Sequence, residues 1–121
     1  MKKIPKVFES EYRFCLVLWE NEPMSAAYLA RLCKVKLEWS RTTTYTVIKK
    51  LCDKGIIENK NSMVSSLVTK DEVQLSDMDE ILEKRFQNSV PAFLAAFAKR
   101  QNLSEKEIEE IKSIIENSGK K

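Results

Sequence analysis

The apolar residues of this chain recur every three or four positions along most of its length, which is the spacing of amphipathic α-helices. The first such stretch runs from Glu9 to about Asn21, where an Asn-Glu-Pro turn ends it. Ser25 is then placed to cap a second helix, which fades near Lys36. We therefore predict two short helices in the first third of the chain.

A third helix is expected from Ser40 to Gly55. The Ser40 side chain can accept a hydrogen bond from a backbone N–H of the first turn, and Gly55 can take the left-handed conformation that ends a helix. An advance of about 100° per residue gives this helix two faces of different chemistry. The apolar face holds Thr44, Val47, Ile48 and Leu51, and the polar face holds Thr42, Thr46, Lys49 and Asp53. The polar face is suited to an anionic partner, although a merely Thr-rich surface helix would have the same pattern.

The period of the pattern changes after Gly55. Ile56-Ile57 begins a stretch typical of a β-strand, Asn61-Ser62 supplies a turn, and the β-branched residues from Val64 to Thr69 suit a returning strand. A two-stranded hairpin is only marginally stable alone, so we expect it to pack on the preceding helices. Three helices followed by a hairpin is the order of a winged helix-turn-helix.

The helical period returns in the C-terminal part of the chain. We expect a hinge at Lys70–Gln74, a helix opened by an S-x-x-D cap at residues 76–79, a helix with Pro91 in its first turn, and a last helix opened by a capping box at residues 104–107. About 45 residues are too few to bury three apolar stripes well. We interpret the stripes as a dimer contact, the alternative being that they fold back onto the N-terminal core. Their residues are Met78, Ile81, Leu82, Phe86, Val90, Phe93, Leu94, Phe97, Ile108, Ile111 and Ile115.

Charge divides the chain near the same place. Residues 1–70 contain 13 Lys/Arg and 7 Asp/Glu, a net +6, whereas residues 71–121 contain 8 and 11, a net −3. A basic segment favours a polyanionic partner. We therefore predict a mainly α protein with a small β-hairpin: a winged helix-turn-helix DNA-binding domain over residues 1–70, followed by a helical dimerisation segment over residues 71–121.

The composition also disfavours several kinds of chemistry. Histidine, the commonest general base and neutral metal ligand, is absent. Cys15, Cys33 and Cys52 lack metal-ligand spacing and fall in apolar helical patterns, so we interpret them as buried, reduced core thiols. No nucleophile, base and orienting group converge, and we expect neither an enzyme nor a metal or cofactor. The longest apolar runs are too short to cross a bilayer, which favours a cytoplasmic protein without membrane insertion.

Three groups of residues resemble the motifs of one family. The first group, similar to an opening E-W-x-V-M-x-x-x-W pattern, is Glu11-Tyr12, Phe14-Cys15 and Trp19. The second, similar to an S-x-x-T-x-x-T-L-x-x-R-L-x-x-K-G signature, is Trp39-Ser40, Thr43, Thr46, Leu51 and Lys54-Gly55. The third is Phe97-Ala98-Lys99, Leu103 and the stretch from Lys106 to Ile111. In this order they resemble the penicillinase repressor family, which includes β-lactamase, methicillin-resistance and copper-responsive repressors.

The resemblance implies a homodimer that represses transcription by covering a two-fold operator in double-stranded DNA. It also implies induction: a membrane sensor with a metalloprotease domain detects a β-lactam, and cleavage in the C-terminal region removes the dimer contact. In several members the cleaved bond is Asn-Phe, and the matching position here is Ala96-Phe97. The copper-responsive members have a Cys-rich C-terminal tail, whereas this chain has no Cys after Cys52, which disfavours copper sensing.

Helix-turn-helix geometry assigns a role to each polar residue around the third helix, because the N-terminal part of a recognition helix reaches base edges. The predicted base readers are Arg41, Thr42, Tyr45 and Thr46. The predicted phosphate ligands are Ser40, Thr43, Lys49, Lys50 and Lys54, with Lys60 and Asn61 reaching the flanking backbone from the hairpin tip. The alternatives are solvated surface charges, or a winged helix that binds protein and not DNA.

Overall fold

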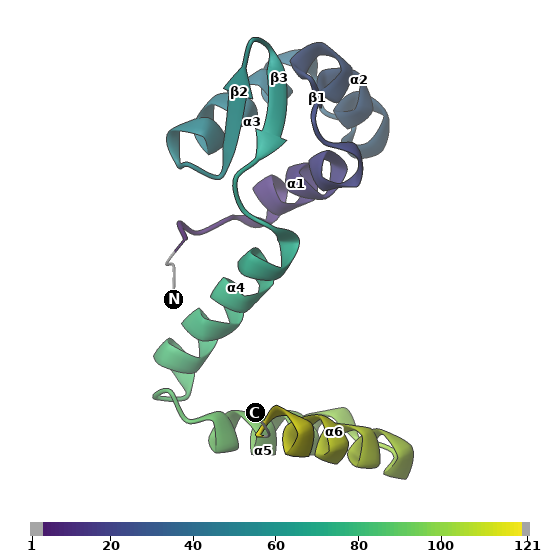
Figure 1. Cartoon of the computed structure of the whole chain (residues 1–121), viewed down its shortest axis with the longest axis vertical. Helices are drawn as coiled ribbons and strands as arrows, with labels where there is room; N and C mark the ends of the chain where they lie inside the picture. The colour runs from purple at the N-terminus through teal and green to yellow at the C-terminus, as the bar shows by residue number, and fades with distance from the viewer. Residues whose placement is uncertain (1–3, 120–121) are drawn as a thin grey trace. The chain divides into compact units, whose positions relative to one another are not determined.

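The computed structural model describes residues 4–119, and they form two compact units, Met1–Asp79 and Glu80–Lys121. The predicted fold class is confirmed: the chain is mainly helical, with a winged helix-turn-helix followed by further helices (Figure 1). Residues 1–3, 120 and 121 lie outside the described part. The sheet belongs wholly to the first unit.

Three helices of the first unit lie where the sequence predicts them. The predicted caps are confirmed, because Ser25 Oγ accepts the Tyr28 N–H at 3.1 Å and Ser40 Oγ accepts the Thr43 N–H at 3.1 Å. Gly55 has the expected left-handed conformation, with φ of 78°. The helices are α1 (Glu9–Asn21), α2 (Ala26–Leu37) and α3 (Arg41–Asp53).

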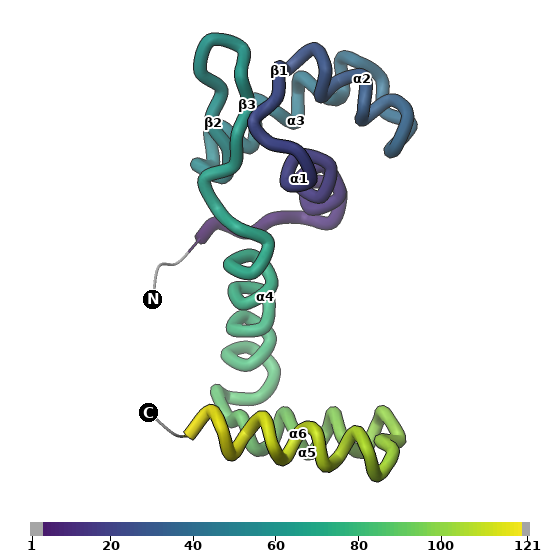
Figure 2. The backbone as a smooth tube through the Cα atoms, turned by 45° about the vertical axis from the view of Figure 1, so that its right-hand side comes forward, coloured from purple at the N-terminus to yellow at the C-terminus, as the bar shows by residue number. Residues whose placement is uncertain are grey.

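The predicted hairpin is confirmed, and a third short strand joins it. The sheet is antiparallel with the order β1-β3-β2, and in Figure 2 β1 lies beside β3. Asn61 and Ser62 form the tip with φ of 53° and 65°, as two-residue hairpin turns require. The strands are β1 (Met24–Ser25), β2 (Ile57–Lys60) and β3 (Met63–Ser66), so the returning strand ends before the predicted Thr69.

The core of the first unit lies between its helices and its sheet. Phe14 and Leu18 of α1 are fully buried with Leu51 of α3, and the Phe14 and Trp39 rings stack with their centres 6.1 Å apart. Trp39 thus anchors the turn between α2 and α3, as a residue just before a helix cap often does. The same core includes Leu29, Cys33, Ile48, Ile56, Ile57 and Val64. It fixes the orientation of α3.

The predicted hinge at Lys70–Gln74 is wrong, because these residues form the first turns of α4 (Lys70–Arg85). Thr69 and Glu72 make the capping box: the Thr69 N–H donates to Glu72 Oε1 at 2.9 Å, and the Glu72 N–H donates to Thr69 Oγ1 at 3.0 Å. The predicted cap at Ser76 and Asp79 is therefore also wrong. Val73, only 1% exposed, packs into the core of the first unit, which favours helix over hinge.

The second unit contains the end of α4 together with α5 (Val90–Gln101) and α6 (Glu105–Ser118). Ser89 Oγ caps α5 by accepting the Ala92 N–H at 3.1 Å. The predicted capping box of Ser104 and Glu107 on α6 is confirmed. Phe86, directly after α4, packs on α5 with its ring centre 5.4 Å from that of Phe93, and within α5 the Phe93 and Phe97 ring centres are 6.3 Å apart. Within residues 4–119, no helix has the length and apolar character to span a bilayer.

Candidate nucleic-acid interface

The polar face of α3 is exposed along the helix. Thr44, Ile48 and Leu51 hold the opposite face in the core, as the sequence predicts for them. Val47, the fourth residue of the predicted apolar face, is half-buried. The predicted base readers and phosphate ligands that α3 exposes are Ser40, Arg41, Thr42, Thr43, Thr46, Lys49 and Lys50. The helix is therefore anchored on one side and open on the other.

A hydrogen-bond relay orients the hydroxyl groups at the start of α3. Ser40 Oγ donates to Thr43 Oγ1 at 2.9 Å while it accepts the Thr43 N–H. Since Thr43 Oγ1 accepts from Ser40, its own proton is directed elsewhere and can be donated to an anion. Thr44 is turned inward and donates its hydroxyl to the Ser40 carbonyl at 3.3 Å. Of the two hydroxyl groups predicted to bind phosphate, that of Thr43 is thus better placed than that of Ser40, whose proton is already donated to Thr43.

Arg41 is held by an aromatic neighbour one helical turn away. Its guanidinium carbon lies 5.4 Å from the centre of the Tyr45 ring, a cation–π contact. Tyr45 is half-buried and packs against the core. The ring therefore restricts the exposed arginine, which reduces the conformational entropy that the side chain would lose on binding a base.

The lysines predicted to bind phosphate divide into two kinds. The Lys49 side chain is 81% exposed, and its ammonium lies 3.8 Å from Asp53, also exposed, so this pair is weak. Lys50 is exposed as well. The Lys54 side chain is only 27% exposed, and its ammonium lies 2.8 Å from the Glu11 carboxylate. Lys54 is therefore not presented to solvent in the same way as the other two.

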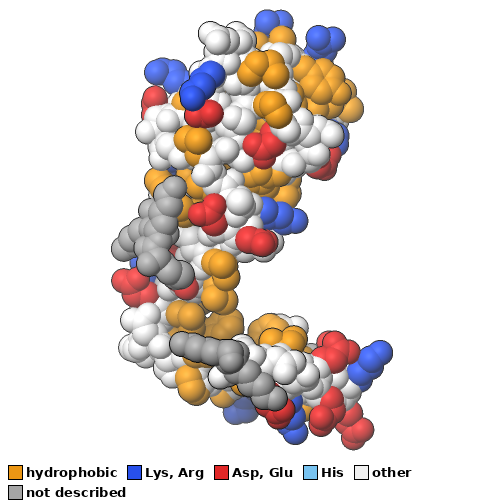
Figure 3. All heavy atoms as spheres, in the orientation of Figure 1, with side chains coloured by type: hydrophobic (Ala, Val, Ile, Leu, Met, Phe, Trp, Pro, Cys, Tyr) orange, Lys and Arg blue, Asp and Glu red, His pale blue; other side chains and the backbone are white. Residues whose placement is uncertain are grey.

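The hairpin tip adds a second exposed polar region. Lys60 is exposed, with its ammonium 3.7 Å from the Glu58 carboxylate, and Asn61 is exposed in the left-handed conformation. Lys and Arg side chains surround this tip at the top of Figure 3. Met63, which follows the tip, is 43% exposed. The sequence does not indicate this exposure, because an isolated Met in a strand pattern carries no signal for a surface position.

The residues predicted for dimerisation are incompletely covered. Leu82, Phe86, Phe93, Leu94 and Ile111 are half-buried, and Met78, Ile81, Val90, Phe97, Ile108 and Ile115 are exposed. Figure 3 shows hydrophobic side chains at the surface of α5 and of the second half of α4. Neither α5 nor α6 has a buried residue among those described. Ala96 and Phe97, at the position that matches the cleaved bond of relatives, are both exposed on α5.

The three cysteines are free thiols in different surroundings. Burial raises the pKa of Cys15 to about 12, and the nearby Glu11 and Glu22 charges raise it further. Burial also raises the pKa of Cys33, while a hydrogen bond from Thr44 lowers it. The prediction that Cys52 is buried is wrong: it is half-buried, in the last turn of α3. Among residues 4–119, no group of three His, Cys, Asp or Glu side chains could hold a metal ion.

The chain is similar to known proteins over nearly its whole length. The penicillinase repressor family model matches residues 8–117. Methicillin resistance regulatory protein MecI of Staphylococcus aureus (strain Mu50) is 25% identical over 117 residues, which cover 93% of this chain and 95% of that protein. A penicillinase repressor of Staphylococcus aureus is 27% identical over 93% of this chain and 92% of its own length. A penicillinase repressor of Bacillus licheniformis is 25% identical over 96% and 94%, respectively.

Proposed function

The chain belongs to the penicillinase repressor family, and from this premise we propose that it binds a two-fold DNA operator as a homodimer and so blocks transcription. In each protomer α3 is the recognition helix. Arg41, Thr42, Tyr45 and Thr46 read bases, and Ser40, Thr43, Lys49 and Lys50 bind phosphate. Lys60 and Asn61 of the hairpin reach the flanking backbone.

The exposed polar face of α3 is the observation that supports this proposal most strongly. It combines an arginine held by Tyr45, an outward-directed Thr43 hydroxyl and two exposed lysines on one helix. Arginine can bond guanine with two hydrogen bonds, and the threonine methyl group can contact thymine. Lysines contribute affinity that does not depend on base sequence. One helix thus offers both kinds of contact that a repressor needs.

The second unit supplies the dimer contact in this proposal. The exposed apolar side chains of α4, α5 and α6 would be buried by a second copy of the chain, and a two-fold protein matches a two-fold operator. Folding back onto the first unit is the competing arrangement. Repression acts in the cytoplasm, on DNA, and the protein has no catalytic activity of its own.

The controlled genes in this proposal are those for β-lactamase or β-lactam resistance, as the names of the relatives indicate. A membrane sensor protease relieves repression by cleaving the C-terminal region, with Ala96-Phe97 as the candidate bond. Because this bond lies inside α5, cleavage requires the helix to open locally. A repressor of the same family that answers another signal is the alternative, as is a winged helix that binds protein without DNA.

The test measures binding of the full chain to the duplex upstream of its own coding region and to an unrelated duplex, at several salt concentrations. We expect tighter binding to the first duplex and a log–log salt slope of several units, because each neutralised phosphate adds about 0.9. Repeating the measurement with extract from β-lactam-treated cells tests induction. Equal, salt-insensitive binding to both duplexes would exclude the proposed operator binding and favour a protein partner.

A further inference from the structure

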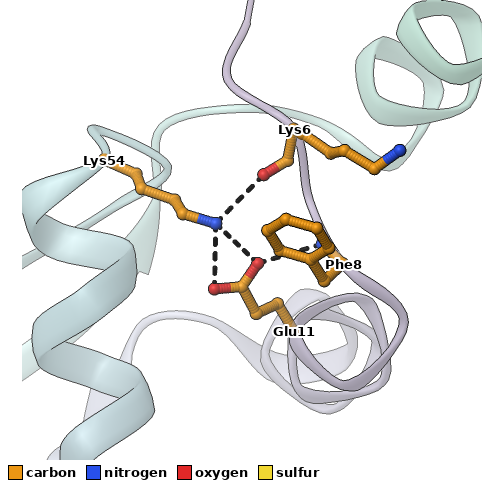
Figure 4. Close-up of polar contacts among 4 residues, drawn as sticks. All are labelled: Lys6, Phe8, Glu11 and Lys54. Atoms are coloured by element: carbon orange, nitrogen blue, oxygen red, sulfur yellow. Dashed lines mark hydrogen bonds and ion pairs between the residues drawn. The ribbon is translucent and has the colours of Figure 1, made fainter.

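The end of α3 is joined to the start of α1 by one ion pair. Lys54, directly after α3, directs its ammonium group toward Glu11 of α1, with Nζ 2.8 Å from Oε1 and 3.0 Å from Oε2 (Figure 4). The Glu11 side chain is only 8% exposed. Removing one partner of such a pair leaves an uncompensated charge in a poorly hydrated place, so the two charges depend on each other.

The same two side chains hold the segment that precedes α1. Lys54 Nζ donates to the Lys6 carbonyl at 3.1 Å and lies 4.6 Å from the centre of the Phe8 ring. Glu11 Oε1 accepts the Phe8 N–H at 2.9 Å, which satisfies a free donor at the start of α1. We call this group of Lys54, Glu11, Phe8 and the Lys6 carbonyl the clasp. It joins the segment before α1, α1 itself and the end of α3.

The clasp uses the full hydrogen-bonding capacity of the lysine. An ammonium group has three N–H donors, and three oxygen atoms lie within hydrogen-bond distance of Lys54 Nζ, two from Glu11 and one from Lys6. A phosphate could bind this ammonium only by displacing one of them. The Lys54 charge is moreover offset by the Glu11 carboxylate. These contacts disfavour the phosphate-binding role that the sequence suggested for Lys54.

The position of the clasp along α3 gives it another role. Lys50 lies one helical turn before Lys54, and its carbonyl accepts the Lys54 N–H at 3.0 Å. The chain then leaves the helix at once through Gly55, and the Ile56 N–H donates to the Leu51 carbonyl at 2.9 Å. Whatever fixes Lys54 therefore fixes the last turn of α3, which contains Lys50 and directly follows Lys49.

We propose that Lys54 and Glu11 are positioning residues for DNA binding: the clasp holds the last turn of α3 so that Lys49 and Lys50 meet the phosphates. This inference rests on the proposed function of α3. It assigns Lys54 to the alignment of the recognition helix and removes it from the phosphate ligands. The two roles can be separated, because a positioning residue acts through Lys49 and Lys50 and loses its effect when they are replaced, whereas a phosphate ligand acts independently of them.

The experiment compares Lys54→Gln, Glu11→Gln and the double variant E11Q/K54Q in the full chain, with the same two duplexes, upstream and unrelated. We expect Lys54→Gln to weaken binding to the upstream duplex about 10-fold, because the contacts of Lys49 and Lys50 are lost. In the matched background K49Q/K50Q, which lacks those contacts, Lys54→Gln should weaken binding less than about 2-fold. Glu11→Gln should weaken binding too, although it makes the protein more positive. The double variant should bind more tightly than either single variant, because no unpaired charge remains.

A second control breaks an ion pair of the same unit at the surface. In the wild type the Lys36 ammonium lies 2.9 Å from the Glu20 carboxylate, and both side chains are well exposed. Glu20→Gln removes this ion pair. We expect unchanged DNA binding for this variant. A loss of about 10-fold from Lys54→Gln in the K49Q/K50Q background as well would overturn the inference in favour of a direct phosphate contact. Tighter binding by Glu11→Gln would likewise show that Glu11 only masks a phosphate-binding lysine.

Folding is followed separately by circular dichroism, and binding is measured below the unfolding temperature of each variant. Unchanged binding by folded single variants would reduce the clasp to a stabilising contact and overturn the inference. If a single variant does not fold, the double variant E11Q/K54Q decides, since positioning requires it to weaken the binding of the wild type but not that of K49Q/K50Q. If the wild type binds no DNA, the proposed function fails. The rate of backbone amide hydrogen exchange in the last turn of α3 then shows whether Lys54→Gln loosens the end of the helix.

Discussion

At the scale of single residues, the proposed function assigns specificity and affinity to different residues of the exposed face of α3. Arg41 is restricted by the Tyr45 ring and lies in the first turn, whereas Lys49 lies in the last turns and is 81% exposed. A restricted planar cation suits base readout, and a mobile ammonium suits a phosphate. Replacing Arg41 should therefore change the preference for operator DNA, whereas replacing Lys49 should change the affinity for any DNA.

We predict that Arg41→Ala will narrow the difference in affinity between operator and unrelated DNA by about 1–3 kcal/mol, because a two-bond contact to a base is lost. Lys49→Ala should weaken binding to both duplexes about equally. Fluorescence anisotropy with both duplexes measures the two effects. Full specific binding by the double variant R41A/T46A would contradict the assignment of the base readers.

The buried Cys15 thiol should make stability depend on alkaline pH. An unfolded thiol loses its proton near pH 9, whereas the folded Cys15 pKa is about 12, so the folded state binds more protons between these values. The stabilising contribution of the neutral thiol is therefore present below pH 9 and is lost as the pH rises, by up to about 1.4 kcal/mol per pH unit.

Urea unfolding at pH 8.0 to 10.5 tests this prediction, with Cys15→Ala as the comparison. The variant will be less stable at every pH because it leaves a cavity, but its free energy of unfolding should fall less steeply as the pH rises. Other groups that titrate in this range contribute equally to both proteins. Parallel curves would show that Cys15 does not titrate differently in the two states.

At the scale of elements, α4 is the helix that sequence patterns placed least well. The stretch Lys70–Gln74 is polar apart from Val73, so it reads as a linker. In the structure Val73 is buried with the helices of the first unit, and the Thr69–Glu72 capping box starts the helix before it. The beginning of α4 therefore belongs to the core of the first unit.

We predict that Val73→Ala will lower the free energy of unfolding by about 2 kcal/mol, through lost burial and the cavity that remains. Leu75→Ala is the matched control, since Leu75 lies on the same helix but is 51% exposed. Its effect should stay within about 0.5 kcal/mol. Chemical denaturation monitored by tryptophan fluorescence compares them, and equal losses for the two variants would contradict the burial of Val73.

At the scale of the whole molecule, the two units differ in how well they bury apolar side chains. The first has a core of fully buried residues from three helices and the sheet, whereas α5 and α6 contain no buried residue among those described. An apolar stripe that a single chain leaves exposed is a site for a partner. We have proposed a second copy of the chain as that partner.

We predict that replacing Ile111 and Ile115 with Asp will weaken self-association at least about 100-fold, because two charges would be buried in an apolar contact. Val35→Asp in the first unit is the control, since Val35 is 80% exposed. Sedimentation equilibrium of the full chain measures the dimer constant. A fragment of residues 1–79 keeps Val73 and should be monomeric; a dimeric fragment would place the contact elsewhere.

The sequence by itself determined most elements of this protein, because the signals for them are local. Caps at Ser25, Ser40 and Ser104 and the turn at Asn61-Ser62 act within a few residues and are readable in order. The two faces of α3 follow from helical period alone. The prediction that α3 binds DNA, by contrast, needed more than periodicity: it used the order of the elements, the basic charge of residues 1–70 and the resemblance to a family.

Only the tertiary structure decided which residues meet across long separations. The contact of Lys54 with Glu11 joins residues 43 positions apart, and the Trp19 indole N–H donates to the Val68 carbonyl 49 positions away. Sequence alone could read Lys54 only as one more cation of a basic helix. Whether a charge is free or paired depends on what the fold places beside it, and for Lys54 that is a nearly buried carboxylate.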